Sequence, residues 1–478
     1  MRDRNLERTC LVKRAMFVTY AAGLALLGLV AVASAGEPTS QPASADWPQF
    51  GGPNRDGHSA IKGIRRDWTG GLKKIWEVKD LSPDTCTWSP PSVQGNRLIV
   101  MGQRANPADN KGNTDTAYCF DADKGGEPLW KQDFPDEYGD YGWGTGPTAA
   151  PTIDGDKVFV AGRDGSLLCL NMADGKVLWK GRGAPACHGY SSSPLVCDDL
   201  LIVAGLSYKP GQYALLGAAN KNTGQAVWNY GKAHGGDSPE YGHVSPARMK
   251  LNGKDQVVYS TGSLVCGMDI RTGQPLWEHA IEKGWGGNYT PAGPVLVWPF
   301  FYVTTSDARP PIGLQLDGTT AKEAWRGFTG NKGKYAPSLS QAIAVNGYLY
   351  SFTTLTDDRD NNWFFGGGPK GCLICVEPKT GLVKWEEKTG NGNVIAVDGC
   401  LLGLTHAGDL LLAEASPDGF KKITEWKGAI ARHPWMYKGK EYKKDPAPCW
   451  AGPVVARGKL YLRYDDTLSC YELAAPRN

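Results

Sequence analysis

The sequence lacks the short motifs that mark several common enzyme classes. It has no H-E-x-x-H zinc motif, no G-x-S-x-G nucleophile elbow and no G-x-x-x-x-G-K phosphate-binding loop. Its 7 histidines are scattered, and no pair has metal-ligand spacing. No C-x-x-C-H haem attachment motif occurs. These absences argue against zincins, α/β-hydrolases, P-loop nucleotide-binding proteins and c-type cytochromes.

The sequence also has little net charge. It carries 52 Lys and Arg against 49 Asp and Glu, a formal charge of +3. Residues 1–14 hold five basic and two acidic side chains, which accounts for the whole excess. The remaining chain is neutral overall and has no general attraction for a phosphate backbone. We therefore exclude nucleic acid as a partner.

The N-terminus reads as an export signal. An uncharged, mostly apolar run from Ala15 to Ala35 follows the basic residues and ends in the small residues Ala33-Ser34-Ala35. We predict a signal peptide over residues 1–35, a Pro/Ser linker over 36–45 and a periplasmic or secreted protein. The alternative is an uncleaved membrane anchor, because such a run is long enough to span a bilayer. No cysteine lies at the cleavage point, which argues against a lipoprotein.

The 12 cysteines suggest disulfides in an exported protein. Cys10 leaves with the signal, so at least one of the others is unpaired. Several occupy similar places in a repeated strand unit and are expected to be small, buried residues: Cys119, Cys169, Cys266, Cys372 and Cys470.

A strand repeat fills the rest of the chain. Its clearest copy runs from Ala150 to Trp179 and contains four short apolar runs separated by turns such as Asp154-Gly155-Asp156. Seven copies end in a tryptophan about 49 residues after the previous one. The closing tryptophans are Trp130, Trp179, Trp228, Trp277, Trp325, Trp385 and Trp426. We expect each to pack against the next unit.

An eighth unit is split between the ends of the chain. Residues 452–473 supply three strands without a tryptophan, and Leu72–Val78, with Trp76, supplies the missing fourth. The sequence therefore predicts an all-β, eight-bladed β-propeller over residues 46–473, with four-stranded antiparallel blades and a C-terminal tail over 474–478. Pairing of the N- and C-terminal strands closes the ring and removes exposed edges. Seven blades is the alternative.

The long insertions all fall in connections that propeller geometry places on one face. They are Arg104–Thr116, Gln132–Pro147, Thr354–Gly371 and Lys427–Pro448. The first strand of each blade begins at the central funnel of the propeller, on the face with the insertions. Aromatic and histidine residues occur at these strand starts and in the long loops of that face, and they form the candidate ligand-binding set. The set is Trp88, Trp143, His188, Tyr190, His243, Tyr289, Tyr335, Trp363, His433, Trp435 and Trp450. Packing of these rings against prolines is the alternative reading.

The D-x-x-T-G-x-x-x-W ending of the unit and the entry sequence Asp46–Pro53 closely resemble the bacterial pyrroloquinoline-quinone (PQQ)-like β-propeller repeat family. The likeness covers about residues 46–473. One type in that family comprises quinoprotein dehydrogenases, which bind PQQ with calcium and use an adjacent cysteine pair and an Asp base. This chain has no adjacent cysteine pair and no clear acidic cluster at the blade entries, so no catalytic residue is carried over. The other type is similar to a scaffold that binds partner proteins in outer-membrane assembly.

These features favour an exported binding or scaffold module, rather than an enzyme, that holds a protein or carbohydrate partner through its loop-rich, aromatic-lined face. We assign it no cofactor and no metal. Membrane contact is expected only through an uncleaved N-terminal segment. The alternative is a PQQ-dependent dehydrogenase that oxidises alcohols or sugars and binds PQQ with calcium.

Overall fold

The computed structural model describes residues 45–476 except 84, 107–111, 138–143, 185–188, 210, 232–243, 252, 262, 282–291, 305–309, 318–319, 331–334, 338–340, 356–370 and 438–439. The predicted signal peptide and all but the last residue of the linker lie outside these residues. Nowhere in the described chain is there a helix long and apolar enough to cross a membrane. All regular structure in that part of the chain is β-strand.

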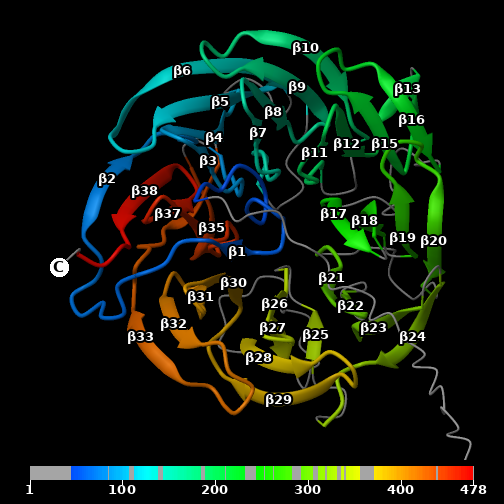
Figure 1. Ribbon diagram of the computed structural model, residues 1–478. Coiled ribbons are helices and arrows are strands. Elements are labelled where there is room, and N and C mark those ends of the chain that lie inside the picture. Colours follow the sequence, from blue (N-terminus) through cyan, green and yellow to red (C-terminus); the bar gives the residue numbers. More distant parts are fainter. Residues whose placement is uncertain are drawn as a thin grey trace, which may run out of the picture. The chain divides into compact units, whose positions relative to one another are not determined.

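Eight sheets surround a central channel, as predicted (Figure 1). Each blade runs outward from a short inner strand to an edge strand, in antiparallel order. Blades 1 to 4 follow the chain directly. Blade 1 is β3 (Ser92–Gln94), β4 (Arg97–Arg104), β5 (Asn113–Asp121) and β6 (Gly125–Asp136). Blade 2 is β7 (Thr152–Asp154), β8 (Lys157–Ala161), β9 (Ser166–Asn171) and β10 (Val177–Arg182). Blade 3 is β11 (Leu195–Cys197), β12 (Leu200–Ala204), β15 (Leu216–Asn220) and β16 (Ala226–Tyr230). Blade 4 is β17 (Ala247–Leu251), β18 (Lys254–Ser260), β19 (Leu264–Asp269) and β20 (Pro275–Ala280).

The later blades carry additions to this plan. Blade 5 is β21 (Val295–Val297), β22 (Phe300–Val303), β23 (Ile312–Asp317) and β24 (Thr320–Arg326). Blade 6 has a split inner strand, β25 (Tyr335–Pro337) and β26 (Ile343–Val345), followed by β27 (Tyr348–Leu355), β28 (Gly371–Glu377) and β29 (Leu382–Glu387). Blade 7 is β30 (Gly392–Val397), β31 (Cys400–Thr405), β32 (Leu410–Glu414) and β33 (Lys422–Trp426), with β1 (His58–Ser59) added on its inner side. Two hairpins stand outside the blades: β13 (Ser207–Lys209) with β14 (Gln212–Tyr213), and β34 (Pro434–Tyr437) with β35 (Lys440–Pro446).

Blade 8 closes the ring from both ends of the chain. Its strands β36 (Val454–Ala456), β37 (Lys459–Tyr464) and β38 (Thr467–Glu472) are followed in the sheet by β2 (Lys74–Val78). Trp76 on β2 lies opposite Cys470 on β38. The predicted eight-bladed propeller with terminal strand pairing is therefore confirmed, and seven blades is excluded.

The fourth-strand tryptophans join one blade to the next. Six indole N–H groups donate to a backbone carbonyl in the turn between the third and fourth strands of the following blade, as Trp130 does to Met172 at 2.8 Å. A glycine in that turn makes room for the ring, since a Cβ on Gly175 would lie 2.5 Å from the Trp130 ring. Gly175 also has a φ of +73°, which glycine adopts without strain. Trp277 differs, because its indole donates to Gln256 of its own blade at 2.9 Å while its ring packs on Phe301 of the next.

The cysteines in the described part of the chain form no disulfides with one another, contrary to the expectation. The ten described cysteines are all free and buried. Four of them lie directly opposite a fourth-strand tryptophan: Cys119, Cys169, Cys375 and Cys470. Ala218, Gly267 and Gly313 take the same place in blades 3, 4 and 5, so the position requires a small residue. Cys266 and Cys372 are buried as expected, but they lie opposite Glu278 and Thr353 rather than opposite a tryptophan.

Candidate functional site

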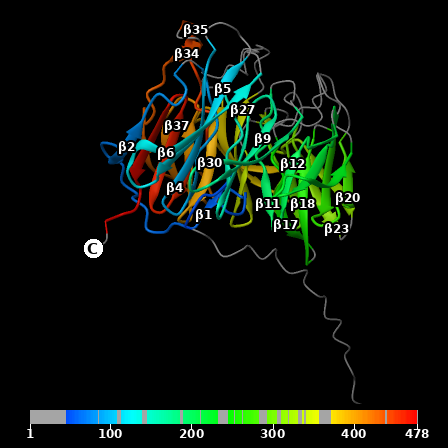
Figure 2. The same cartoon turned by 90° about the horizontal axis from the view of Figure 1, so that it is seen from above.

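One face of the propeller carries the added hairpin. The β34–β35 hairpin projects at one end of the molecule, near the ends of β5 and β27, whereas β1 and β17 lie at the opposite end (Figure 2). The hairpin comes from the insertion Lys427–Pro448, and the insertions in blade 1 lengthen β4, β5 and β6. We call this end the loop-rich face and the other the turn face.

The structure describes four side chains of the predicted ligand-binding set: Trp88, Tyr190, His433 and Trp450. Five members lie outside the described residues, namely Trp143, His188, His243, Tyr289 and Trp363. Tyr335 lies on β25 and Trp435 on β34, but their side chains are not described. Three of the four described residues gather between blades 8 and 1, and Tyr190 lies apart from them.

Trp88 and Trp450 meet at the junction of blades 8 and 1. Their ring centroids are 4.7 Å apart at an interplanar angle of 67°, an edge-to-face contact. Trp88 is buried, whereas Trp450 is half-buried. Asn393 in blade 7 donates its amide to the Trp450 carbonyl at 3.2 Å and so fixes the backbone that carries this ring. The pair therefore offers a partly exposed aromatic surface on a rigid base.

Asp465 lies at the same junction of blades 8 and 1 and was not in the predicted set. Its carboxylate accepts the Thr87 N–H at 3.2 Å and the Cys86 thiol at 3.7 Å. Burial raises the pKa of Asp465 to about 8, although the nearby Arg463 opposes this. His433 Nε2 lies 3.7 Å from the same carboxylate, and its ring packs on Tyr464 at 5.0 Å. The only sequence signal is the acidic pair Asp465-Asp466 in a turn between two strands.

Tyr190 has a structural environment. It is 3% exposed, and its hydroxyl donates to the Ala204 carbonyl at 3.1 Å. Its backbone N–H donates to the Arg163 carbonyl at 2.7 Å. Burial raises the pKa of the Tyr190 phenol well above its ordinary value. This ring packs between blades 2 and 3 and offers little surface to a ligand.

A second buried acidic group lies in blade 1. The Gln103 amide donates to Asp115 at 2.7 Å and Asp136 at 2.9 Å, and its oxygen accepts the Thr145 hydroxyl at 2.5 Å. Burial and the neighbouring Asp136 raise the pKa of Asp115 well above its ordinary value. Burial thus disfavours the charged form of Asp115, and the hydrogen bonds of Gln103 join β4, β5 and the end of β6.

The residues of the described chain do not fit PQQ with calcium. Calcium needs several converging oxygen ligands, and no group of three or more His, Cys, Asp or Glu residues in the described parts could hold a metal ion. Asp465, the buried acid at this junction, already accepts hydrogen bonds from Thr87 and Cys86 and lies near the cation Arg463. We derive no reaction step through this cofactor.

Residues 45–59 line the central channel on the turn face. The repeat pattern of the sequence does not indicate this position. Trp47 exchanges two backbone hydrogen bonds with Val93 in β3, the inner strand of blade 1, and the Pro48 carbonyl accepts the Ile153 N–H of β7 in blade 2. β1 pairs in parallel with β30 of blade 7. The segment therefore completes inner strand edges that the repeat leaves open. We call it the channel segment.

Arg55 anchors the channel segment at its centre. It is 3% exposed and donates to the backbone carbonyls of Ser193 at 3.0 Å, Pro246 at 2.9 Å and Pro194. Burial lowers the pKa of Arg55 to about 9, so it stays charged at neutral pH. The residues that accept these hydrogen bonds directly precede the inner strands of blades 3 and 4. One side chain therefore connects the channel segment to two blades that are far from it in the sequence.

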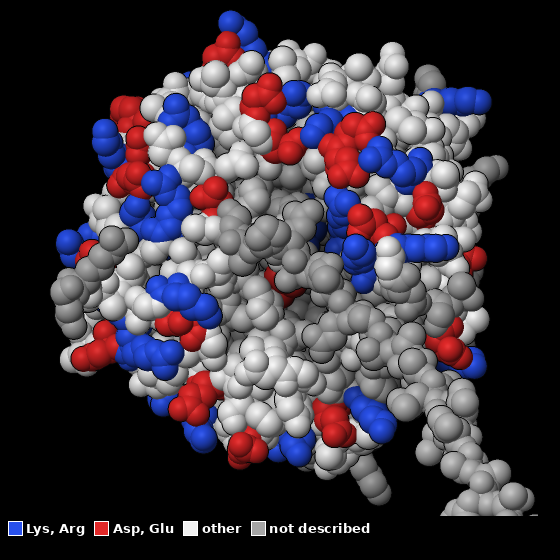
Figure 3. Space-filling view, viewed as in Figure 1, with Lys and Arg blue, Asp and Glu red and all other residues white. Residues whose placement is uncertain are grey.

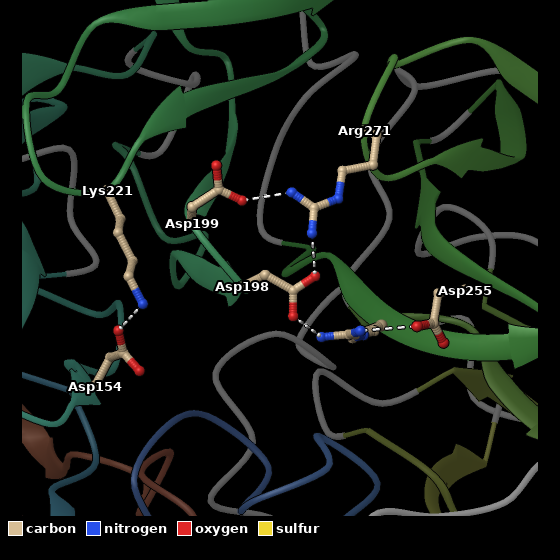
Figure 4. A network of polar contacts seen from close by, with 7 residues as sticks. Asp154, Asp198, Asp199, Lys221, Asp255 and Arg271 are labelled. Carbon is tan, nitrogen blue, oxygen red and sulfur yellow. Dashed lines mark hydrogen bonds and ion pairs between the residues drawn. The ribbon is translucent and has the colours of Figure 1, made fainter.

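A hollow of about 930 Å³ opens beside Arg55 on the turn face. Its rim carries charged side chains of both signs (Figure 3). Arg248 bridges Asp198 at 3.2 Å and Asp255 at 2.8 Å, while Lys221 pairs with Asp154 at 2.5 Å (Figure 4). Arg271 continues the network outward to Asp198 at 3.0 Å. These pairs fix the mouth of the hollow between blades 2, 3 and 4.

The family model and the curated relative that match this chain carry the same description. The family described as outer membrane protein assembly factor BamB matches this chain over residues 113–309. BamB of Shewanella oneidensis is 29% identical over 175 residues, which cover 34% of this chain and 39% of the relative. The match thus spans about two fifths of that curated relative.

Solved structures share the fold at low identity. BamB from Moraxella catarrhalis has a TM-score of 0.53 at 15% identity, covering 85% of this chain and 99% of that one. A europium-containing methanol dehydrogenase has a TM-score of 0.55 at 14% identity, covering 87% of this chain and 89% of that one. Sqt1 of Chaetomium thermophilum, solved bound to the N-terminus of ribosomal protein L10, has a TM-score of 0.55 at 12% identity, covering 84% and 100%. At these identities the likeness is one of fold alone.

Proposed function

This chain belongs to the PQQ-like β-propeller repeat family, and on that premise we propose that it is a scaffold that binds a partner protein through its loop-rich face. The observation that carries the proposal is the aromatic pair Trp88–Trp450, because Trp450 and His433 lie just outside the two strands of the β34–β35 hairpin. Partly exposed aromatics on a rigid base are typical anchors of protein interfaces.

The family likeness supports a protein partner. The relative with 29% identity is named for its part in outer-membrane protein assembly, so we propose a related scaffold role in the periplasm, after export by the N-terminal signal. The relatives reported above give no support to a carbohydrate ligand. The dehydrogenase alternative rests on fold likeness alone, and the described residues do not fit its cofactor.

Site-specific photo-crosslinking tests the proposed face. We would place p-benzoylphenylalanine at position 435 on β34 and, as a matched control, at position 124 in an exposed turn on the turn face. Irradiation of cells that express the full chain should give a discrete protein adduct from position 435 and none from position 124. Trp450→Ala combined with the probe at 435 should reduce that adduct severalfold, because the anchor is lost.

Two results would overturn the proposal. Equal adducts from positions 435 and 124 would show that the loop-rich face is not selective. A saturable rise in melting temperature with PQQ plus calcium, together with dye-linked alcohol oxidation, would favour the dehydrogenase, because a ligand of the native state stabilises it.

A further inference from the structure

The inner strand edges around the channel are not treated alike. The innermost strand of each blade pairs along one edge with the next strand of its own sheet. Its other edge faces the channel. The channel segment covers this edge in blades 1, 2 and 7 by the contacts of Trp47, Pro48 and β1. In blade 8, Ser59 donates its hydroxyl to the Val455 carbonyl at 3.1 Å. The chain thus uses an extended segment of its own to occupy these edges.

β17 of blade 4 has such an edge, and the channel segment does not pair with it. β17 has five residues, more than the three-residue inner strands of its neighbours, and β18 is its one strand partner among the described residues. Arg55 reaches only the Pro246 carbonyl just before the strand. Every second residue of an antiparallel edge strand turns its N–H and C=O away from its partner. Those groups on β17 therefore face away from blade 4.

This edge borders the hollow. Arg248, Met249 and Lys250 of β17 all line it, with Val196 of β11 and Leu296 of β21 on either side. A volume of about 930 Å³ lies at the upper end of the roughly 300–1,000 Å³ typical of ligand pockets. The hollow is therefore large enough for a short extended peptide beside β17, whose five residues span about 17 Å.

The side chains that line the hollow indicate which residue types a bound peptide should contain. Met249, Val196 and Leu296 are half-buried apolar residues, which suit apolar side chains on one face of an added strand. Lys250 is exposed, and within the described residues it takes part in no ion pair, whereas Arg248 is held by two carboxylates. An acidic residue on the incoming strand would complement Lys250.

We propose that the turn face holds a second binding site, in which an extended apolar-acidic peptide segment of a partner protein adds as a strand to the inner edge of β17. This mode, β-augmentation, takes its affinity from main-chain hydrogen bonds and its specificity from alternate side chains. The chain's own β1 does the same on β30. The site lies on the opposite face from the proposed scaffold surface and does not depend on it.

The test uses a labelled seven-residue peptide that alternates valine and glutamate. We expect saturable binding to the full chain by fluorescence anisotropy, and slower hydrogen exchange of the amides in residues 247–251 when the peptide is bound. A second peptide with the same side chains but N-methylated inner amides cannot pair with a strand edge. It should bind at least tenfold more weakly.

Two matched variants locate the site. Lys250→Glu should weaken binding of the valine–glutamate peptide about tenfold through charge reversal in the hollow. Lys124→Glu changes the same charge on the same face, outside the hollow lining, and should leave binding unchanged. Both lysines are exposed, so neither change disturbs the core.

Several outcomes would overturn this inference: no binding, equal binding of the N-methylated peptide, equal loss in both variants, or no protection of residues 247–251. Crosslinking from position 435 measured in Lys250→Glu keeps the two proposals apart. An unchanged adduct there, with no peptide binding in the parent chain, would refute the β17 site and leave the scaffold proposal standing.

Discussion

At the scale of single residues, the fourth-strand tryptophans explain why glycines and cysteines recur at fixed positions of the repeat. Each ring needs a small residue opposite it in its own blade, such as Cys169 beside Trp179, and in most blades a glycine beneath it in the next, such as Gly224. A larger side chain at either place would overpack a core that is already at organic-crystal density. Leu410 opposite Trp426 is the exception to the first requirement, while the Trp426 ring packs on Gly71, just before β2 of the next blade.

Buried titratable residues near the aromatic pair should make stability depend on pH. Burial raises the pKa of Asp465 from 3.8 to about 8, so the folded chain keeps a proton that the unfolded chain loses. The free energy of unfolding therefore falls as pH rises between about 4 and 8, by up to about 1.4 kcal/mol per pH unit. Asp465→Asn removes this slope, and its melting temperature should exceed that of the parent by a margin that grows from pH 5 to pH 8.

His406 supplies the opposite slope. Burial, with repulsion from Arg432, lowers its pKa from 6.5 to about 3, so the unfolded chain binds the extra proton. Its contribution to stability is complete above about pH 6.5 and is lost as pH falls towards 3. Glu127→Gln, at an exposed acid on β6 of blade 1, is the control for Asp465→Asn and should leave the pH profile unchanged. A parallel shift in both variants would contradict the assignment to Asp465.

At the scale of elements, the channel segment is the part of the fold with no counterpart in the repeat. Its anchor, Arg55, satisfies three backbone carbonyls at the start of blades 3 and 4. Removing the guanidinium leaves these carbonyls buried without a donor, which costs about 1–3 kcal/mol for each group that water cannot reach. Release of the unfavourable buried charge offsets part of this.

We therefore expect Arg55→Met to lower the free energy of unfolding by about 2 kcal/mol, measured by urea denaturation. Arg66→Met, at a side chain that is 53% exposed, is the matched control and should change it by less than about 0.5 kcal/mol. Arg55→Met should also speed hydrogen exchange in residues 45–59, because their anchor is gone. Unchanged exchange there would show that the backbone hydrogen bonds of Trp47, Pro48 and β1 hold the segment without Arg55.

The elements differ in how far the sequence predicts them. Strand periods and Asp-Gly turns are local signals, so the eight blades and the pairing of Trp76 with the last blade follow from the sequence. The contacts of Arg55 and Asp465 join residues far apart in the chain, such as Arg55 with Pro246, and leave no periodic trace. For the same reason the sequence does not indicate the hollow, which is made by inner strands of different blades.

At the scale of the whole molecule, ring closure distinguishes blade 8 from the other blades, because its strands come from both ends of the chain. Blade 8 is held together by β2 and β38, whose paired residues Trp76 and Cys470 are far apart in the sequence. The Trp76 indole then donates to the Ala122 carbonyl of blade 1 at 3.3 Å. In the other blades, such as that of Trp179, the fourth strand follows the third directly in the chain, so a covalent turn also holds it in its sheet.

Truncation of these two tryptophans should therefore have similar energetic but different structural consequences. Trp76→Ala removes a buried ring and Trp179→Ala a half-buried ring of the same size, and each should cost up to roughly 3–5 kcal/mol. Only Trp76→Ala frees the closing strand, exposing the β38 edge and residues 66–80 before global unfolding. Limited proteolysis in mild urea should cut residues 66–80 severalfold faster in Trp76→Ala than in Trp179→Ala. Identical cleavage patterns would mean that the channel segment, through Arg55 and β1, keeps the ring closed without the β2 junction.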